Sequence, residues 1–516
     1  MKKVLLLFTL LLSLFIVSCT GSTLSTGMLS TTTNQTSSST NSTTSTNQTT
    51  TTWDGQPTTT TSLPTGTTEV NYDSLFDNTN YKKFTLYFSR ANFDKLINDM
   101  QNYNDQFGSY RDNTIQQIDM VYEDGHGNVF TMNEVGFRTK GNIFSRRLPV
   151  VLSDQGELLG YQQVSFQLEF NEAFDYPVNS TQYKALRARR AFGLEQLNFK
   201  YIRDNDTSAV TELAAYDYFR SVGIVAPNTS LAIIYFDIDG EVIPYGLFTV
   251  IEPIDDVFVR RYFGRNQDGS IGDLYKCVWQ DPGPANLKNN LNSRKLGVSD
   301  YNDGYRKTYQ LKTNKTTSNY SIFMSFVSQL NNKTVPNYQN ILGNILDMDT
   351  WLKTLAMSFL LGNPDDYRSD ANNYYLYFYE RQAIYIPFDY DQSMGFGWNP
   401  YGDYGISLNV WDYPPAQGAL GSSKDLPLVY NILEIPSFRL TYENYLLEFT
   451  NPVNGVFNTT IFEIASYYAQ LLYQGEILSN QHLGLQTISL VNRYMSISDY
   501  FTQKTISTRN QILSKK

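Results

Sequence analysis

The feature that most constrains this fold is a tract of Ser, Thr, Asn and Gln that runs from Thr20 to Thr68. It carries almost no charge and few apolar residues, so it cannot bury enough surface to offset the entropy lost on ordering. We therefore predict a flexible tether over residues 20–69 and a folded body over residues 70–516. Any hydrophobic core has to be built from that body.

A short apolar segment before the tether has the form of an export signal. Basic residues at positions 2 and 3 precede the apolar run Val4–Val17, which is short for a membrane span and fits a signal-peptide core. The run ends in Ile16-Val17-Ser18-Cys19, which resembles a bacterial lipobox. We expect residues 1–19 to be a lipoprotein signal, with Cys19 lipidated and the chain anchored to the membrane on the extracytoplasmic surface. An ordinary secretory signal is the alternative.

Histidine and cysteine are rare, and this excludes several kinds of site. The chain has two His and two Cys in 516 residues. A disulfide-rich scaffold, a multi-cysteine zinc site and a three-histidine metal site are therefore impossible. The net charge of −10 argues against nucleic acid as a partner. Aromatic residues make up 15% of the chain, which rules out disorder of the whole chain. The length allows a large core, and we expect a monomer.

The hydrophobic periodicity of the body changes from strand-like to helix-like along the chain. Predicted strands are 81–88, 116–122, 128–132, 134–139, 164–170, 231–237 and 245–251, with short helices at 92–100 and 208–222. Predicted helices of the second half are 320–330, 351–361, 436–448, 460–474 and 485–501. This order indicates an α+β body with a β-rich N-terminal lobe, a helix-rich C-terminal lobe and a cleft between them.

One segment concentrates carboxylates and amides around a predicted hairpin. Strands are expected at 374–379 and 383–388, joined by the turn Glu380-Arg381-Gln382. Pairing Tyr379 with Ala383 sets Asn373 opposite Asp389, about 5 Å away. The polar loop before the hairpin and the acidic residues after it then meet at its open end. Oxygen ligands without His or Cys suit a hard cation such as Mg²⁺. Each residue taken singly has a structural alternative, such as capping a turn.

The order of these residues is typical of protein kinases. In those enzymes a catalytic-loop Asp and a metal-binding Asn precede a hairpin, and a metal-binding Asp follows it. Here the order is Asp366, then Asn372 or Asn373, then the hairpin, then Asp389 and Asp391.

Several blocks in the same order resemble the CotH family, the atypical kinases named after spore coat protein H. The central block is Gly362–Tyr367, Asn373–Tyr377, Ile386–Asp391 and Gly395–Gly397. Supporting blocks are Phe137–Asn142, Tyr245–Phe248, Glu252–Asp255, Leu274–Lys276 and Tyr309–Asn314. The resemblance extends from about Tyr81 to the C-terminus.

The resemblance implies a divergent protein-kinase-like fold that binds ATP with Mg²⁺ or Mn²⁺ and phosphorylates Ser or Thr of a protein substrate, here on the cell surface. Asp366 then matches the catalytic aspartate, with Asp365 as the alternative register. Asp389 and Asp391 match the metal ligands without a choice of the primary one, and Asn372 or Asn373 would bind a second metal. Candidates for phosphate contacts or their orienting ion pair are Arg138, Lys140, Glu252 and Lys276.

Two departures from the family pattern and two other functions remain open at this point. Phe388 replaces the usual Trp, and Gln162–Phe166 lies where a phosphate-pairing Lys is expected, so that Lys140 or Arg146 and Arg147 would have to substitute. An anchored chain rich in Tyr could instead be a non-catalytic adhesion protein. The pair Asp389-x-Asp391 also resembles the metal motif of a glycosyltransferase, which would prefer sugar nucleotides to ATP.

Overall fold

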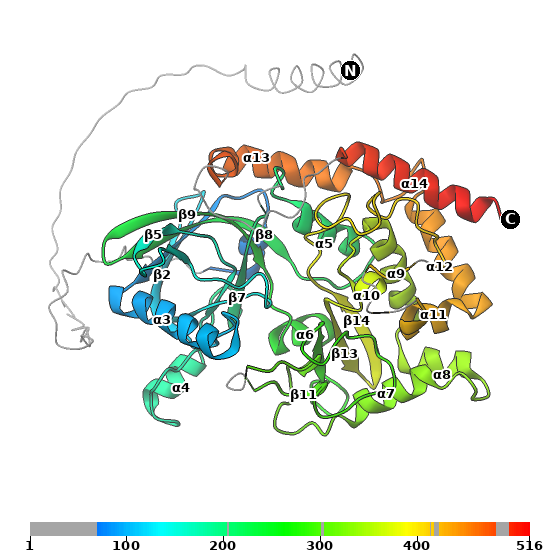
Figure 1. Cartoon of the computed structure of the whole chain (residues 1–516), viewed down its shortest axis with the longest axis horizontal. Helices are drawn as coiled ribbons and strands as arrows, with labels where there is room; N and C mark the ends of the chain where they lie inside the picture. Colours follow the sequence, from blue (N-terminus) through cyan, green and yellow to red (C-terminus); the bar gives the residue numbers. More distant parts are fainter. Residues whose placement is uncertain are drawn as a thin grey trace, which may run out of the picture. The chain divides into compact units, whose positions relative to one another are not determined.

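The computed structural model describes residues 70–203, 206–300, 304–412, 414–416, 420, 423–480 and 495–515. The predicted signal with Cys19, the tether and the first part of the helix predicted at 485–501 lie outside these residues. The described part belongs to one compact unit, Thr61–Lys516. It is a mixed α+β structure (Figure 1).

Seven strands of the N-terminal half form a closed barrel, which the sequence did not predict. The barrel order is β1-β2-β3-β6-β7-β9-β8, and the parallel pair β1–β8 closes it. Stacked and edge-to-face rings fill the interior, such as Phe166 and Phe199 with centroids 4.6 Å apart. The strands are β1 (Lys82–Phe88), β2 (Gln116–Asp124), β3 (Val129–Thr139), β6 (Phe166–Glu169), β7 (Gln196–Tyr201), β8 (Thr229–Ile238) and β9 (Glu241–Ile251).

Smaller elements surround the barrel. Helix α3 (Arg90–Phe107) buries Phe93, Leu96 and Met100 in the barrel core, and Ser89 and Gly108 cap its ends. The prediction of a helix at 92–100 was therefore too short, because polar residues continue the helix on its solvent side. The other elements are α2 (Tyr72–Phe76), β4 (Val150–Leu152), β5 (Leu158–Tyr161) and α4 (Thr181–Arg187).

The second half builds a five-stranded sheet and packs helices on it. The sheet order is β11-β12-β10-β13-β14. The buried residues of one face join those of the helices in a large core, and those of the other face form a smaller cluster with Phe258 and Val259 of α6. The strands are β10 (Leu274–Cys277), β11 (Leu296–Gly297), β12 (Tyr309–Leu311), β13 (Tyr374–Tyr379) and β14 (Gln382–Pro387). The helices are α5 (Thr211–Ser221), α6 (Asp256–Phe263), α7 (Ser321–Asn331), α8 (Tyr338–Ile345), α9 (Met348–Leu361), α10 (Tyr367–Asp370), η2 (Ser423–Asp425), α11 (Pro427–Leu433), α12 (Pro436–Phe449), α13 (Thr460–Asn480) and α14 (Ile497–Leu513).

Helix α13 connects the C-terminal helices to the barrel. In Figure 1 it runs along the barrel beside β8 and β9. The Tyr473 hydroxyl donates to the Leu231 carbonyl at 3.0 Å and accepts from the Lys82 backbone N–H at 2.7 Å. Helix α14 ends at Leu513, so the predicted end at Phe501 was wrong. Within the described ranges no helix is both long and apolar enough to span a membrane.

The predicted β13–β14 hairpin is present, but its predicted register was wrong by one residue. Tyr379 pairs with Gln382, not with Ala383. The turn contains two residues, Glu380 and Arg381, with φ angles of 46° and 71°, as a type I′ turn requires. Extending the pairing beyond Tyr374 and Pro387 sets Asn373 opposite Phe388 and not opposite Asp389. The two polar segments still meet at the open end of the hairpin.

Candidate functional site

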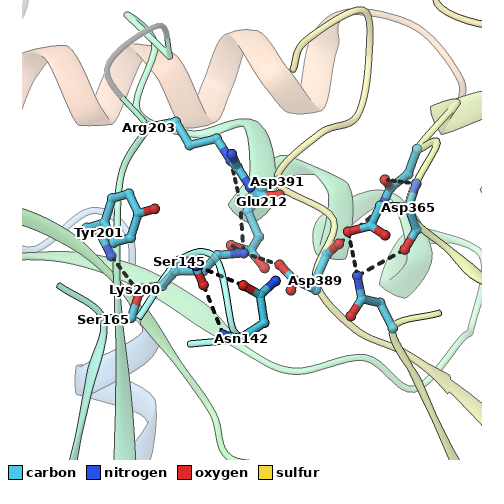
Figure 2. Close-up of polar contacts among 12 residues, drawn as sticks. Asn142, Ser145, Ser165, Lys200, Tyr201, Arg203, Glu212, Asp365, Asp389 and Asp391 are labelled. Carbon is cyan, nitrogen blue, oxygen red and sulfur yellow. Dashed lines mark hydrogen bonds and ion pairs between the residues drawn. The ribbon is translucent and has the colours of Figure 1, made fainter. Parts of the chain in front are cut away.

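A lysine that sequence reasoning missed lies at the centre of the site. On β7, Leu197, Phe199 and Tyr201 are buried in the barrel, so the alternation of the strand projects Lys200 from its outer side. The ammonium pairs with Glu212 at 2.9 Å, with Asp391 at 3.1 Å and with Asp389 (Figure 2). Strand β7, helix α5 and the loop after β14 thus converge on one cation.

Glu212, Asp389 and Asp391 form what we call the carboxylate centre. One oxygen from each lies within 4.8 Å of the other two. An all-oxygen donor set at this spacing fits Mg²⁺ or Mn²⁺. The Lys200 ammonium already shows that the three groups can share one cation, and a metal ion would have to compete with it.

Arg203 supplies a second positive charge to the carboxylate centre, next to Asp391. Arg203 Nε lies 2.7 Å from Asp391. Burial alone would raise the pKa of Asp391, but Arg203 and Lys200 outweigh it and hold that pKa well below the usual range. Burial raises the pKa of Glu212 to about 7, even though Lys200 acts to lower it. The centre therefore keeps Asp391 ionised while Glu212 titrates near neutrality.

Asp365 faces the carboxylate centre from the loop after α9. Asn372 donates to its Oδ1 at 2.8 Å, and Asn373 donates to its Oδ2 at 2.9 Å. Burial raises the pKa of Asp365 to about 7, Asn372 acts to lower it, and the charges of Asp389 and Asp391 raise it further. Figure 2 shows Asp365 on the far side of Asp389 from Lys200.

The neighbouring Asp366 has a different environment. It caps α10 by accepting from the Ser369 N–H at 2.9 Å, and it accepts from the hydroxyls of Tyr390, at 3.2 Å, and Ser358. Its side chain is buried, and burial raises its pKa. The structure thus places Asp366 in a hydrogen-bonded cluster beneath the loop, and it places Asp365 at the surface that faces Asp389.

Unusual backbone conformations aim these side chains. Asp389 has φ 65° and Asn373 has φ 53°, in the left-handed region that residues with a Cβ seldom adopt. Tyr216 accepts from the Asp389 N–H at 2.8 Å, and Asn363 Nδ2 donates to the Asp389 carbonyl at 3.0 Å. These two hydrogen bonds stabilise the strained backbone of Asp389. Strained backbone conformations are common where a side chain must be held in one direction.

The four proposed phosphate contacts are spread over two places. Arg138 pairs with Glu169 at 2.8 Å, Lys140 donates to Asn198 at 2.5 Å, and Lys276 lies 4.6 Å from the centre of the Phe388 ring. Glu252 lies elsewhere, buried against α6, where Arg261 pairs with it at 2.5 Å. Arg138 and Lys276 lie close enough to Lys140 to act on its pKa, whereas Glu252 is held apart by its contacts with α6.

Sequence reasoning missed Lys200 and Arg203 because strand β7 was not predicted, and it missed Glu212 because nothing in its predicted helix pointed to a partner. The signal was present: Lys200 is the polar residue between Phe199 and Tyr201 in an alternating segment, and Glu212 lies in the first turn of a predicted helix. The family pattern predicts the phosphate-pairing lysine within Gln162–Phe166. There the Gln163 amide donates to the Tyr245 carbonyl at 2.9 Å.

Comparisons with known proteins agree with the resemblance seen in the sequence. Residues 138–483, two-thirds of the chain, match the family model described as CotH kinase protein. The matched range includes β7, the carboxylate centre and the loop of Asp365. No curated protein matches the chain.

Proposed function

Because the chain belongs to the CotH kinase family, we propose that it is an extracytoplasmic protein kinase, anchored to the membrane by lipid. It would transfer the γ-phosphate of ATP to Ser or Thr of proteins on the cell surface, with Mg²⁺ or Mn²⁺. The family match supports kinase function in general. The observation that carries the specific proposal is the ion-pair cluster of Lys200 with Glu212, Asp389 and Asp391.

The proposal assigns a role to each member of this cluster. Asp389 and Asp391 would hold the divalent cation, which supplies positive charge to the phosphates when bound. Lys200 would then turn toward the phosphates while Glu212 orients it, as the lysine–glutamate pair does in protein kinases. Arg203 keeps Asp391 ionised. We also propose that the barrel and the helix-rich part act as the two lobes of a kinase-like fold.

The structure favours Asp365 over Asp366 as the residue that receives the proton of the substrate hydroxyl. A general base works best when its pKa lies near the operating pH, and the pKa of Asp365 is about 7. Asn372 and Asn373 fix both carboxylate oxygens through their amide N–H groups. Either amide oxygen could turn toward a second metal ion, but Asn372 Oδ1 already accepts from the Trp279 N–H at 2.6 Å. Asn373 is therefore the better candidate.

The test of the reaction is transfer of label from γ-³²P-ATP. The purified chain should label itself or an added surface-protein extract with Mg²⁺ or Mn²⁺, and Lys200→Met should remove the signal. The Lys333→Met variant is a matched control, because Lys333 lies in an exposed turn after α7, where it pairs with Glu434. If wild-type protein neither binds ATP nor labels any protein with either metal, the kinase proposal is wrong.

The anchor needs a test of its own. The Cys19→Ser variant should be released from the membrane fraction into the medium, while wild-type protein stays with the membrane and incorporates labelled fatty acid. Equal membrane retention of the two proteins would contradict a lipid anchor at Cys19.

A further inference from the structure

One tyrosine hydroxyl contacts two members of the carboxylate centre. Tyr216 lies on α5 one turn after Glu212, so the two side chains share a face of the helix. The Tyr216 hydroxyl donates to Glu212 Oε1 at 3.2 Å and accepts from the Asp389 N–H at 2.8 Å. A phenol has a single O–H to donate, and a backbone N–H only donates, so both roles of the hydroxyl are fixed. The hydroxyl thus connects helix α5 to the loop after β14.

Lys200 connects the same two acids from the other side. Its ammonium pairs with Glu212 Oε2 at 2.9 Å and with Asp389 Oδ1 (Figure 2). The two carboxylate oxygens of Glu212 are therefore divided between Tyr216 and Lys200. Together the contacts form a closed ring that runs from Tyr216 through Glu212, Lys200 and Asp389 back to Tyr216.

Burial and backbone strain make the Tyr216 hydroxyl hard to replace. Tyr216 is fully buried and Glu212 almost so, and a buried polar group that loses its partner has little access to water. Asp389 has φ 65°, so its side chain keeps its direction only while neighbouring groups hold the backbone. The contact from the Asp389 N–H to Tyr216 is one of those that hold it.

We propose that Tyr216 is a positioning residue, which sets Asp389 and Glu212 for metal binding when the Lys200 ammonium leaves Asp389. The inference rests on the proposed function, in which Lys200 turns toward the phosphates. That turn opens the ring between Lys200 and Asp389 and leaves the Tyr216 hydroxyl as the ring's link from Glu212 to Asp389. Because the hydroxyl binds the backbone N–H of Asp389, it leaves both carboxylate oxygens of that residue to a cation.

The same helix offers a matched control. Tyr218 is also fully buried, and its hydroxyl also donates to one group, the Asn458 carbonyl, and accepts from a backbone N–H, that of Phe462 at 3.4 Å. These partners belong to α13 and the segment before it, and not to the carboxylate centre. Tyr216→Phe and Tyr218→Phe each delete one buried hydroxyl and keep the ring, so their melting temperatures should fall by similar amounts.

The test is a titration of the full-length chain with Mn²⁺ in the absence of nucleotide, followed by electron paramagnetic resonance of the free ion. Tyr216→Phe should weaken Mn²⁺ binding about tenfold, and Tyr218→Phe should leave it within about twofold of wild type. Equal Mn²⁺ affinity in the two variants would overturn the proposal. A Tyr216→Phe chain that does not fold, while Tyr218→Phe does, would make the hydroxyl purely structural and would overturn it as well.

Repeating the titration in the Lys200→Met chain shows whether the hydroxyl acts on the acids or through the lysine. No ammonium competes with Mn²⁺ there, and Tyr216→Phe should again weaken binding about tenfold. A loss of affinity that requires Lys200 would contradict the inference.

The titrations also separate this inference from the proposed function. A wild-type chain that binds no Mn²⁺ would overturn the inference together with the metal role of Asp389 and Asp391. If wild-type protein transfers phosphate from ATP and Tyr216→Phe binds Mn²⁺ as tightly as wild type, the inference alone is wrong.

Discussion

Asp365 and Asp366 are adjacent in sequence, but they belong to regions with opposite character. Asp365 faces the carboxylate centre, where Lys200 and Arg203 balance several acids and the neighbouring side chains carry full charge. Asp366 belongs to a buried cluster in which neutral hydroxyls and a backbone N–H bind its oxygens. Under the proposed function, the first region carries the reaction and the second holds the loop, and mutations should separate the two roles.

The largest effect is expected from Asp389→Asn at the carboxylate centre. The change removes a charge from the group that would hold the metal, and activity should fall by about a thousandfold or more. The melting temperature should stay nearly constant, since the Asp389 side chain is about one-third exposed, at 32%. Phosphate-transfer rates and thermal melting on the same preparation check both statements. A variant that keeps half of the wild-type rate would remove Asp389 from the mechanism.

Asp365→Asn should reduce activity by about a hundredfold to ten-thousandfold, because the amide cannot accept the proton of the substrate hydroxyl. The fold should tolerate the change, which removes a buried carboxylate with a raised pKa. Single-turnover kinetics separate the chemical step from ATP binding, which should change little. Near-wild-type turnover in Asp365→Asn would contradict Asp365 as the general base and favour Asp366.

Asp366→Ala should act mainly on stability. It leaves the Ser358 and Tyr390 hydroxyls and the Ser369 N–H without their acceptor in a buried site, at a cost of about 2–4 kcal/mol. Denaturant unfolding measures this change. At a temperature where the variant is folded, its rate per folded molecule should remain within about tenfold of wild type. An Asp366→Ala variant that is stable but inactive would show that Asp366 takes part in the reaction and does not only stabilise the loop.

The acids of the first region should also make stability depend on pH. The folded pKa values of Asp365 and Glu212 are raised to about 7 from ordinary values of 3.8 and 4.5. The folded protein thus binds more protons than the unfolded chain between about pH 4 and 7, so metal-free stability should fall as pH rises through that window. Glu212→Gln should flatten this slope in thermal melts. The pKa of Asp391 is lowered, and its contribution to stability is lost only in more acidic solution.

The smallest effect is expected from Tyr390→Phe. This change removes one of the hydrogen bonds to Asp366 and keeps the ring in the core, so the cost should be about 0.5–1.5 kcal/mol. Activity should not change. Chemical denaturation and a rate measurement suffice, and a large loss of rate would tie the buried cluster directly to the reaction.

Many of the strands and helices could be predicted, because the spacing of apolar residues within each element is a local property of the sequence. The strands β2, β3, β8 and β9 and the helices α5, α7, α9 and α12 were all expected from alternation or helical spacing. The barrel could not be predicted, since closure depends on the pairing of β1 with β8, which nothing within either strand encodes. The register error at Glu380-Arg381 has a related cause: neither residue is typical of the type I′ turn that they form.

The site was predictable to the extent that its residues are close in sequence. The segment from Asp365 to Asp391 brings its own acids and amides together through one hairpin, and an error of one residue in the register did not separate them. Lys200 and Glu212 come from strand β7 and helix α5, and they reach the site only through tertiary packing. The choice between Asp365 and Asp366 required knowledge of which side of the loop faces inward.

The parallel closure of the barrel has a consequence for how the chain folds. Strand β1 lies near the start of the folded body, yet its second partner begins at Thr229, and the Tyr473 hydroxyl that bonds the Lys82 backbone lies 391 residues further along the chain. Contacts of such high sequence separation form slowly, since a long loop must close before they contribute. During synthesis, one edge of β1 therefore stays unpaired until β8, which ends at Ile238, has emerged, and the hydrogen bond to Tyr473 forms later still. We expect refolding to be slow and truncation within α13 to destabilise the first strand of the barrel.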